Sequence, residues 1–463
     1  STTGWRDTLF LRVFSGMDPT FFYNSFIQIN KAQYYHNDFR FRFISFGRKS
    51  GRYDAWHVDY VYMNKGRIAN DLSFPDRAYF TTLSPLFDQY YAMPHRHFKS
   101  NVAANTSFNS FGLANLKAGA PGNGQPMNYS FYEKTVSYLN GTPTTRNLVL
   151  ANATPILPSI EPLEKRMLTL SQKPDYTALA SADSIVTDLT VVLETGDSVN
   201  TGFEPIDFYV NDTLRQSYRL TDYYAYDDGT AEYAAGLTTA GNHMAYKFEM
   251  KTPGQDTIKA VSFYFPYFAG TSATSMAFSI LSNDNGMPGD VLYEQTIDIE
   301  QTANNLIREI SLFEGVIVQG TFFISYREPA TGKVRIGLDK SHDTGDRMYY
   351  RLTDTSPWQV NDRVTGSFMM RPKFGHAIVP TTGLPEEEHP VVIYPNPSNG
   401  DFYLKGLVDN IHILTITGQP VAFTMEEQGD EKKVNMATVS RGVYILTYRS
   451  GQKVYTEKLI ITN

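Results

Sequence analysis

The sequence predicts an all-β protein, with several β-sandwich or jelly-roll domains in tandem that end in a small Ig-like sandwich. Turn-forming residues recur roughly every 8–12 residues, a spacing typical of sandwiches and barrels. Short apolar runs such as "AVSFYFPYF" and "GVYILTY" lie between the turns. Aromatic residues make up 14% of the chain, with 31 Tyr and 30 Phe, and these residue types favour half-buried strands. Both observations indicate β structure.

Individual segments support this fold class. In "FRFRF", Phe39, Phe41 and Phe43 alternate with two arginines, so a strand here would place the rings on one face and the charges on the other. Helical periodicity is scarce, and the best candidate for a helix is "EPLEKRML", residues 161–168. We therefore expect one short helix in an otherwise β chain.

Length and composition exclude several classes of protein. The chain has 463 residues, more than one hydrophobic core normally organises, so roughly three or four domains are expected. The formal net charge is -7, which does not attract a phosphate backbone, and no nucleic-acid partner is predicted. The absence of cysteine removes disulfides, thiolate zinc sites and cysteine nucleophiles. No apolar run approaches the roughly 18 residues that span a bilayer.

Shifts in composition divide the chain into five parts. The clearest break is "PTTGLPEEEHP", which is rich in Pro and Glu and is typical of a linker. The parts are residues 1–66, the C-terminal part of a jelly roll; residues 67–218, an Ig-like β domain with a long lead-in; residues 219–380, a jelly-roll β-sandwich; residues 381–389, the linker; and residues 390–463, a small sandwich.

The stretch "YPNPSNG", residues 394–400, is a stiff corner between two short apolar runs. Pro395 and Pro397 donate no backbone hydrogen bond and hold φ at about -65°, and each pushes the preceding residue toward extended geometry. The chain must therefore leave strand pairing after Tyr394. Asn399-Gly400 then provides a tight turn, because both residue types tolerate positive φ. The residues alone indicate a rigid first turn of the last module.

That module resembles a known family. "YPNPSNGDFYL", "ITGQPV", "VSRGVYILTY" and the terminal "KVYTEKLIITN" are similar, in content and order, to the type A C-terminal sorting domain of type IX secretion cargo from Bacteroidota. The resemblance covers about a sixth of the chain and nearly all of the module. It implies a secreted or cell-surface protein on the exterior of the outer membrane.

The resemblance also implies partners. These are the type IX outer-membrane translocon and its shuttle barrel and, in many cargoes, a sortase-like peptidase that attaches the cargo to surface lipopolysaccharide. A last edge strand offers unpaired backbone groups to a receptor, so we expect Lys453, Glu457, Lys458 and the segment from Leu459 to Asn463 to carry the address. The predicted sorting-signal residues are Tyr394, Pro395, Asn396, Pro397, Asn399, Gly400, Gly442, Tyr444, Lys453, Glu457, Lys458, Leu459, Ile460 and Ile461.

Two upstream segments carry weaker resemblances. Residues 219–380 resemble a jelly-roll module of large Bacteroidota surface proteins, on pieces such as "YYAYDDGTAEY" and "GSFMMRPKFG"; this implies an architecture and no activity. "NDFRFRFIS" and "DAWHVDYVYMN" are similar to the last strands of a concanavalin-like or MAM-like jelly roll. About half of such a domain would have to precede Ser1, so we expect more protein upstream.

Acidic loops suggest one cofactor, calcium. Asp227, Asp228 and Asp339 are the candidate ligands, because Ca²⁺ takes 6–8 oxygens and tolerates irregular loops. The alternative is that these residues belong to a strand-entry turn and a solvated loop. His95 and His97 would point to one side of a strand, but no third metal ligand is evident, so a structural role is favoured.

Five Asp-Ser/Thr-aliphatic triplets resemble the O-glycosylation signal of exported Bacteroidota proteins. A glycan would add bulk and solubility to an exposed loop; the alternative is that each triplet is an ordinary turn. The candidate acceptors are Thr8, Ser184, Ser198, Thr213 and Thr257.

No catalytic motif is present: the sequence lacks a G-x-S-x-G elbow, an H-E-x-x-H motif, a phosphate loop and a dinucleotide fingerprint. We therefore expect no enzyme in this part of the protein, and an adhesin or scaffold at the cell exterior, in gliding or colonisation. Two alternatives stay open. The modules could be accessories of a secreted hydrolase whose catalytic domain lies upstream, or they could bind extracellular glycan on Trp56 or Trp358.

Overall fold

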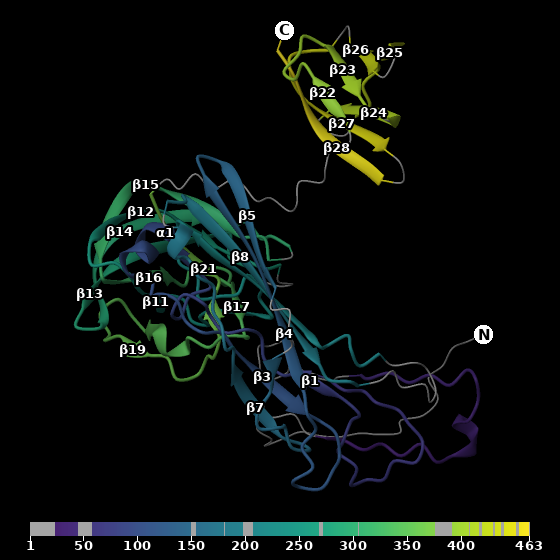
Figure 1. Cartoon of the computed structure of the whole chain (residues 1–463). Coiled ribbons are helices and arrows are strands. Elements are labelled where there is room, and N and C mark those ends of the chain that lie inside the picture. The colour runs from purple at the N-terminus through teal and green to yellow at the C-terminus, as the bar shows by residue number, and fades with distance from the viewer. Residues whose placement is uncertain are drawn as a thin grey trace. The chain divides into compact units, whose positions relative to one another are not determined.

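The computed structural model describes residues 24–44, 58–149, 154–179, 181–197, 207–267, 272–303, 305–375, 391–406, 408–415, 419–428, 431–436, 439–450 and 453–462. The chain divides into two compact units, Ser1–Ile378 and Val379–Asn463. Strands dominate both units, and the described residues contain a single α-helix, α1 (His95–Phe98) (Figure 1). The all-β prediction is confirmed. None of the described helices has the length and apolarity to cross a membrane.

The first unit contains a β-sandwich of two sheets. One sheet has the strand order β1-β3-β7, and the other has the order β2-β9-β8-β4-β5 with β6 paired to β4. The pair β2-β9 is parallel, whereas the other pairs are antiparallel. The bounds are β1 (Arg77–Tyr79), β2 (Ala92–Pro94), β3 (Ser110–Asn115), β4 (Asn128–Leu139), β5 (Thr142–Val149), β6 (Thr154–Pro155), β7 (Lys165–Thr169), β8 (Ser184–Glu194) and β9 (Thr213–Thr221).

Aromatic contacts join these two sheets. The ring centroid of Phe111 on β3 lies 5.3 Å from that of Tyr79 on β1 and 6.0 Å from that of Tyr129 on β4. Leu189 and Val191 of β8 are both fully buried. Successive side chains of a strand point to opposite faces, so these two residues share the face that points into the core. The first sandwich therefore has the alternating core that the sequence predicts.

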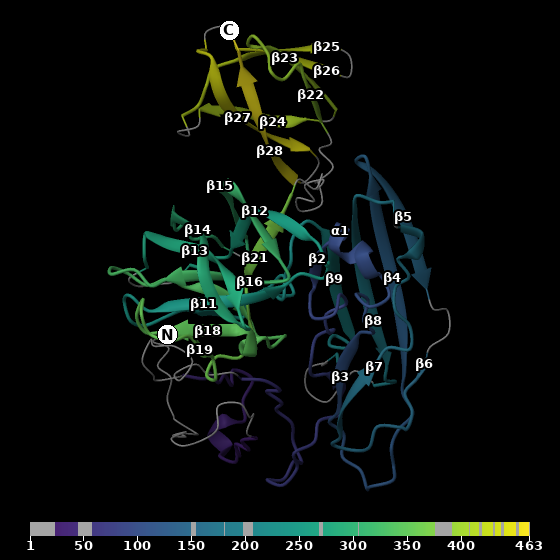
Figure 2. The same cartoon turned by 90° about the vertical axis from the view of Figure 1, so that its left-hand side faces the viewer.

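Three further sheets follow in the same unit, and Figure 2 shows the strands β11 to β16 of two of them beside the sheet that contains β4 and β8. Their strand orders are β10-β17-β20, β14-β13-β16-β11-β18-β19 and β15-β12-β21. The bounds are β10 (Tyr233–Ala235), β11 (His243–Glu249), β12 (Gln255–Phe263), β13 (Ser275–Asp284), β14 (Met287–Asp298), β15 (Arg308–Gln319), β16 (Thr321–Arg327), β17 (Ile336–Asp339), β18 (Met348–Arg351), β19 (Gln359–Val360), β20 (Ser367–Phe368) and β21 (Met370–Phe374). Short 3-10 turns lie at η1 (Ala32–Tyr34), η3 (Lys99–Asn101), η4 (Thr177–Leu179) and η5 (Gly345–Arg347).

Phenylalanine pairs pack these sheets face to face. Phe263 on β12 meets Phe278 on β13 with ring centroids 5.6 Å apart, and Phe322 on β16 meets Phe374 on β21 at 6.0 Å. All four side chains are almost fully buried. Both pairs join the sheet of β12 to the sheet of β16, which makes a second sandwich.

A tyrosine-lined seam joins the two sandwiches into one folded unit. The hydroxyls of Tyr90 and Tyr226 lie 2.9 Å apart, and their rings stack with centroids 4.4 Å apart. The backbone N–H of Glu249 donates to the Tyr90 hydroxyl at 3.0 Å. A single cluster of buried apolar residues includes members of both sandwiches. The border expected between residues 218 and 219 falls inside β9, which pairs with β2 and β8 of the first sandwich.

The two histidines of H-x-H lie at this seam, on a helix and not on a strand. His95 and His97 belong to α1, and both are buried. His97 is hydrogen-bonded through Nδ1 to the Tyr224 hydroxyl at 2.8 Å and through Nε2 to the Asp256 carboxylate at 2.6 Å. Burial lowers the pKa of His95 to about 4 and also lowers the pKa of His97. These contacts favour a structural role for the pair.

Two local expectations are wrong. Residues 161–168 form no helix: Leu163 has φ of 62°, Glu164 donates its N–H to the Glu161 carbonyl at 3.1 Å, and the chain continues into β7. A tight turn with a left-handed residue cannot continue a helix. "FRFRF" forms no strand, and Phe41 is 47% exposed. Alternation alone does not make a strand without a partner to complete the backbone hydrogen bonds.

The second unit, Val379–Asn463, includes the residues at which a small sandwich is predicted. Its described strands form two sheets, with orders β22-β23-β26-β25 and β24-β27-β28. A separate buried cluster fills the space between them, including Phe402, Ile413 and Leu446. The bounds are β22 (Val392–Tyr394), β23 (Asp401–Lys405), β24 (Asp409–Thr415), β25 (Thr424–Gln428), β26 (Glu431–Asn435), β27 (Gly442–Ser450) and β28 (Lys453–Ile461).

Replacing Tyr90 with Phe should weaken the seam of the first unit. The change Tyr90→Phe leaves the buried N–H of Glu249 without its acceptor, and an unsatisfied buried group costs about 1–3 kcal/mol. Chemical denaturation should show this loss in the free energy of unfolding of the first unit. The control is Tyr132→Phe, because Tyr132 is 40% exposed. An equal loss in the two variants would contradict the role of the seam.

Candidate functional site

The corner at residues 394–400 lies beside the last strand of the C-terminal module. The chain leaves β22 at Tyr394, as the two prolines require, and the peptide bonds before Pro395 and Pro397 are cis. Gly400 has φ of 106°, a left-handed value that favours glycine. Its carbonyl accepts the N–H of Met436 at 2.8 Å, which returns the chain to the sheet at β23. The corner is therefore held from both ends.

Asn396 pairs with β28 through its side-chain amide. The Asn396 NH₂ group donates to the carbonyl of Lys458 at 2.7 Å, and its carbonyl oxygen accepts the N–H of Ile460 at 2.9 Å. A primary amide offers one donor and one acceptor side by side, as a peptide group does. The side chain of Asn396 therefore replaces a short piece of neighbouring strand.

Ser398 continues this pairing with its backbone. The N–H of Ser398 donates to the carbonyl of Ile460, and the N–H of Thr462 donates to the carbonyl of Ser398, both at 2.9 Å. The corner thus covers the outer edge of β28 over residues 458–462. Neither Pro395 nor Pro397 has an N–H, so the corner covers this edge while presenting few new donors of its own.

The first half of β28 has no such cover. β27 and β28 pair antiparallel without a register shift, from Gly442↔Ile461 to Ser450↔Lys453. Because the N–H of Ile460 points away from β27, alternation directs the backbone groups of Lys458, Thr456 and Val454 outward too. Among the described residues, no partner is found for the outward groups of Val454 and Thr456. As far as the described residues show, the sheet has an open edge of about five residues, 454–458.

The other predicted sorting residues divide into core and surface positions. Leu459 and Ile461 are buried in the module core, and Tyr444 is 9% exposed with its hydroxyl donating to the Ser440 carbonyl at 2.7 Å. Gly442 begins β27, and the Tyr394 ring stacks on that of Tyr403 with centroids 5.5 Å apart. Thr456 and Lys458 are exposed, whereas Glu457 is half-buried. Among the described residues near the end of the chain, Thr456, Lys458 and Thr462 are therefore the exposed positions, whereas Leu459 and Ile461 are buried.

The sequence did not indicate that two residues of this site, Ser398 and Thr462, pair with each other. Ser398 and Thr462 bond to each other's backbone across more than sixty residues of chain. Small polar residues in a turn and at a terminus carry no signal of long-range pairing. The only available hint was the alternation along the last strand, which directs the backbone N–H and C=O groups of every second residue to the same edge.

Comparison with known proteins identifies the module. Residues 392–462 match the family model described as a secretion system C-terminal sorting domain. This chain is a type IX secretion cargo. It is exported to the cell surface or the extracellular space, and its sorting domain interacts with the type IX secretion machinery.

The comparison with solved structures gives a much weaker match. One solved structure, a "Biofilm associated protein - BSP domain", is 10% identical over 86% of this chain and 85% of that chain, with a TM-score of 0.14. So low a score supports no argument about function. The comparison with curated proteins found no match.

The three predicted calcium ligands of the cargo lie close together but already have partners. Asp227 forms a buried ion pair with Arg371. The carboxylate of Asp339 accepts the N–H of Asp228 at 2.8 Å, and the carboxylate of Asp228 accepts the N–H of Thr230 at 2.9 Å. The described residues include no group of three or more His, Cys, Asp or Glu side chains arranged to hold a metal ion. Calcium binding here stays a prediction.

The predicted glycosylation and glycan-binding residues are scattered. Thr8, Ser198 and Trp56 lie outside the described residues. Ser184 begins β8 and is 1% exposed, which leaves no room for a glycan on the folded chain. Thr213 and Thr257 are half-buried on β9 and β12. Trp358 is half-buried, and the guanidinium carbon of Arg351 lies 4.7 Å from the centroid of its ring, so one face is not free to stack on a sugar.

Removing the Asn396 amide should loosen the end of β28. Asn396→Ala deletes two hydrogen bonds, each worth about 0.5–1.5 kcal/mol, and frees the N–H of Ile460. Hydrogen exchange of the full chain should show faster exchange at Ile460 and a less stable C-terminal module. Asn399→Ala is the control, since Asn399 makes a single 3.3 Å contact to the N–H of Asp401. Unchanged exchange at Ile460 would contradict the pairing.

The buried carboxyl of Asp339 should make the first unit less stable as pH rises. Burial, with the nearby Asp228 carboxylate, raises the pKa of Asp339 from 3.8 to about 8. Below about pH 4 both states are protonated; between there and pH 8 only the unfolded state loses the proton, so unfolding is increasingly favoured. Calorimetry should show that the Tm of Asp339→Asn falls less over this pH range than the Tm of the unmodified chain. Asp212, Asp222 and Glu328 have pKa values raised in the same direction, so some slope remains.

The control for this pH series is Asp290→Asn, because Asp290 is exposed on β14. It should reproduce the pH dependence of the unmodified chain. If Asp339→Asn and Asp290→Asn show the same slope, the buried Asp339 carboxyl is not the source of the pH dependence.

Proposed function

We propose that this cargo works as an adhesin or scaffold at the cell exterior, in gliding or colonisation, and that it has no enzymatic activity in this part of the protein. The observation on which this rests is the sorting domain at residues 392–462, which delivers the attached sandwiches to the outside of the cell. Those sandwiches are held by dense apolar cores, as suits a structural or binding role. Fold alone does not give an activity.

An exposed apolar patch on the first unit supports a binding role. Val291 and Leu292 of β14, and Phe313 and Ile317 of β15, are between 46% and 85% exposed. Leu292 and Ile317 line one hollow of about 300 Å³, and the N–H of Phe313 donates to the hydroxyl of Tyr293 beside Leu292. Large contiguous apolar patches on soluble proteins commonly mark interaction sites, whereas single exposed apolar residues are normal.

We also propose finer partners within the export route. A shuttle barrel of the outer membrane receives the sorting domain after the translocon, and a sortase-like peptidase exchanges it for surface lipopolysaccharide. Two other functions remain alternatives. A hydrolase domain upstream of Ser1 would make these sandwiches accessories, and a glycan array with Trp358→Ala would test carbohydrate binding.

Export should depend on the sorting domain. A chain that ends at residue 390, expressed in a host with type IX secretion, should remain in the periplasm, whereas the full chain reaches the surface. Protease shaving and antibody labelling of whole cells measure the exposed fraction. The full chain in a strain without the translocon is the control. Surface display of the shortened chain would refute the function assigned to this domain.

Adhesion should depend on the apolar patch. The double change Phe313→Ser and Ile317→Ser removes the two most exposed members on β15 and should reduce attachment of cells or coated beads several-fold. Export and Tm should stay unchanged, because neither side chain is buried. The control is Leu352→Ser with Val360→Ser, at sites 54% and 48% exposed elsewhere on the unit. Equal attachment of all variants would exclude this patch.

A further inference from the structure

Three basic side chains stand side by side on the second sandwich, on the sheet with the order β14-β13-β16-β11-β18-β19. His243 of β11 is the register partner of Arg327 on β16 and, on its other side, of Arg351 on β18. Cross-strand partners lie on the same face, with Cβ atoms about 4.5–5.5 Å apart. The adjacent residues Met244 and Tyr326 are buried in the core, so the three basic side chains point to the opposite face. These three residues form the basic row.

One carboxylate, that of Asp354 in the turn after β18, contacts the basic row among the residues that the structure describes. Nε2 of His243 donates to it at 2.6 Å, because a carboxylate can only accept, and Nη2 of Arg327 donates to it at 3.3 Å. The hydrogen bond from His243 lowers the pKa of Asp354, so the carboxylate is ionised at neutral pH. Its side chain is 61% exposed. The basic row therefore already binds one oxyanion group, at a place that water reaches.

A single carboxylate does not neutralise two guanidinium groups. The guanidinium of Arg351 forms no ion pair or hydrogen bond with any described residue, and its Nε is buried without a partner. Its central carbon lies 4.7 Å from the centroid of the Trp358 ring, and this cation–π contact holds the side chain beside the row. Burial lowers the pKa of Arg351, the Asp354 carboxylate opposes this, and Arg327 adds to it. The basic row therefore keeps an excess of positive charge.

We propose that Arg351 and Arg327, with the Nε2–H of His243 between them, bind an oxyanion group such as sulfate, phosphate or carboxylate. Guanidinium groups present several N–H donors in a fork that fits the oxygens of such groups. Asp354 is the internal competitor, because a ligand that contacts Arg351 must share Arg327 and His243 with it. The site lies on the first unit, and it depends neither on export nor on the apolar patch.

Two substitutions with opposite expected effects test this site. Arg351→Gln removes the guanidinium without an ion pair and should weaken anion binding about tenfold, as the loss of a charge-assisted hydrogen bond implies. Asp354→Asn removes the competing carboxylate and should tighten binding several-fold. A merely structural role of these residues would not produce opposite effects on affinity. Titration calorimetry of the full chain at low salt measures both, because chloride screens such interactions.

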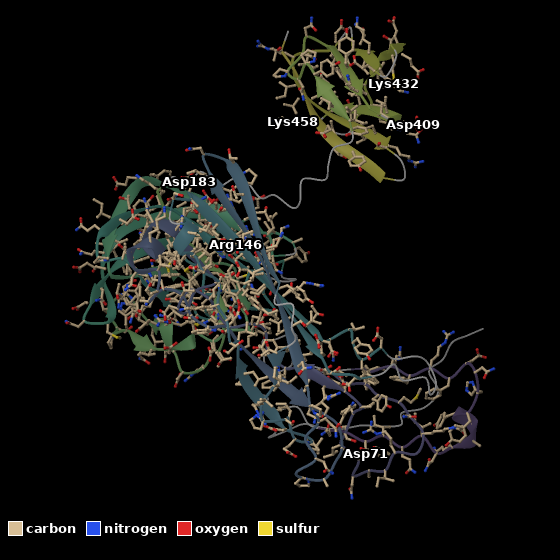
Figure 3. All side chains as sticks on the ribbon, viewed as in Figure 1. Asp71, Arg146, Asp183, Asp409, Lys432 and Lys458 are labelled. Atoms are coloured by element: carbon tan, nitrogen blue, oxygen red, sulfur yellow. The ribbon has the colours of Figure 1, made fainter. Side chains whose placement is uncertain are left out.

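The titrants distinguish the two sources of the anion. Sodium sulfate supplies it free, dextran sulfate supplies it on a polysaccharide, and uncharged dextran is the blank. The control variants are Arg215→Gln, at an exposed position on β9, and Asp71→Asn, which is labelled in Figure 3 and pairs with Arg67 at 3.2 Å. Both controls should bind as the unmodified chain does. Thermal unfolding verifies that each variant is folded, and Asp354→Asn decides the matter if Arg351→Gln is not.

Each outcome of the titration supports or overturns the site. Binding of sodium sulfate that Arg351→Gln weakens supports a site for the free anion. Binding of dextran sulfate alone, weakened in the same way, supports a site for the anion on a polysaccharide. Dextran sulfate binding that Arg351→Gln and Asp354→Asn leave unchanged is general charge attraction and overturns the proposal. Failure of the unmodified chain to bind either anion also overturns it, whereas export and adhesion stand or fall by their own measurements.

Discussion

The C-terminal module depends on how its last strand satisfies its outer backbone groups. A two-sheet sandwich always leaves edge strands with unpaired N–H and C=O groups, and these invite association with other chains. In this cargo the side chain of Asn396 and the backbone of Ser398 bond to the outer edge of β28. The prolines on either side of Asn396 lack an N–H. The corner therefore covers an edge without extending the sheet by a full strand.

The first unit solves a related problem at its seam. Two sandwiches that pack together bury polar groups from the ends of their strands, and each buried group needs a partner. The hydroxyls of Tyr90 and Tyr226 and the imidazole of His97 supply those partners between apolar rings. One apolar cluster runs through both sandwiches, whereas the sorting domain has a cluster of its own. The sorting domain therefore has a hydrophobic core of its own, which includes no residue of the first unit.

The sequence predicted the features that depend on local chemistry. Alternation and turn spacing predict strands, and the two prolines place the end of β22 at Tyr394 correctly. The same reasoning failed where a local pattern lacked a tertiary partner: "FRFRF" has the alternation of a strand and forms none. Residues 161–168 have helical composition, but the turn at Leu163 directs them into β7. Local propensity is a weak prior that packing overrides.

The candidate site lay beyond local reasoning for a different reason. The sorting motifs drew attention to the right segments, yet the pairing of Asn396 with Lys458 and Ile460 joins residues at opposite ends of the module. The sequence suggested that the final residues are the accessible ones, but Leu459 and Ile461 fill the core. Only the three-dimensional register shows that the free backbone groups lie at Val454 and Thr456.

An open strand edge also brings a risk of self-association. Exposed charge beside the edge reduces this risk. Free strand edges promote self-association, and proteins commonly oppose this with exposed charge. Two copies of β28 that paired edge to edge would bring their exposed Lys458 side chains to one seam, and exposed lysine on an edge strand disfavours such pairing. The charge of Lys458 can therefore disfavour pairing between copies, a discrimination that the backbone groups cannot supply because they are the same in every strand.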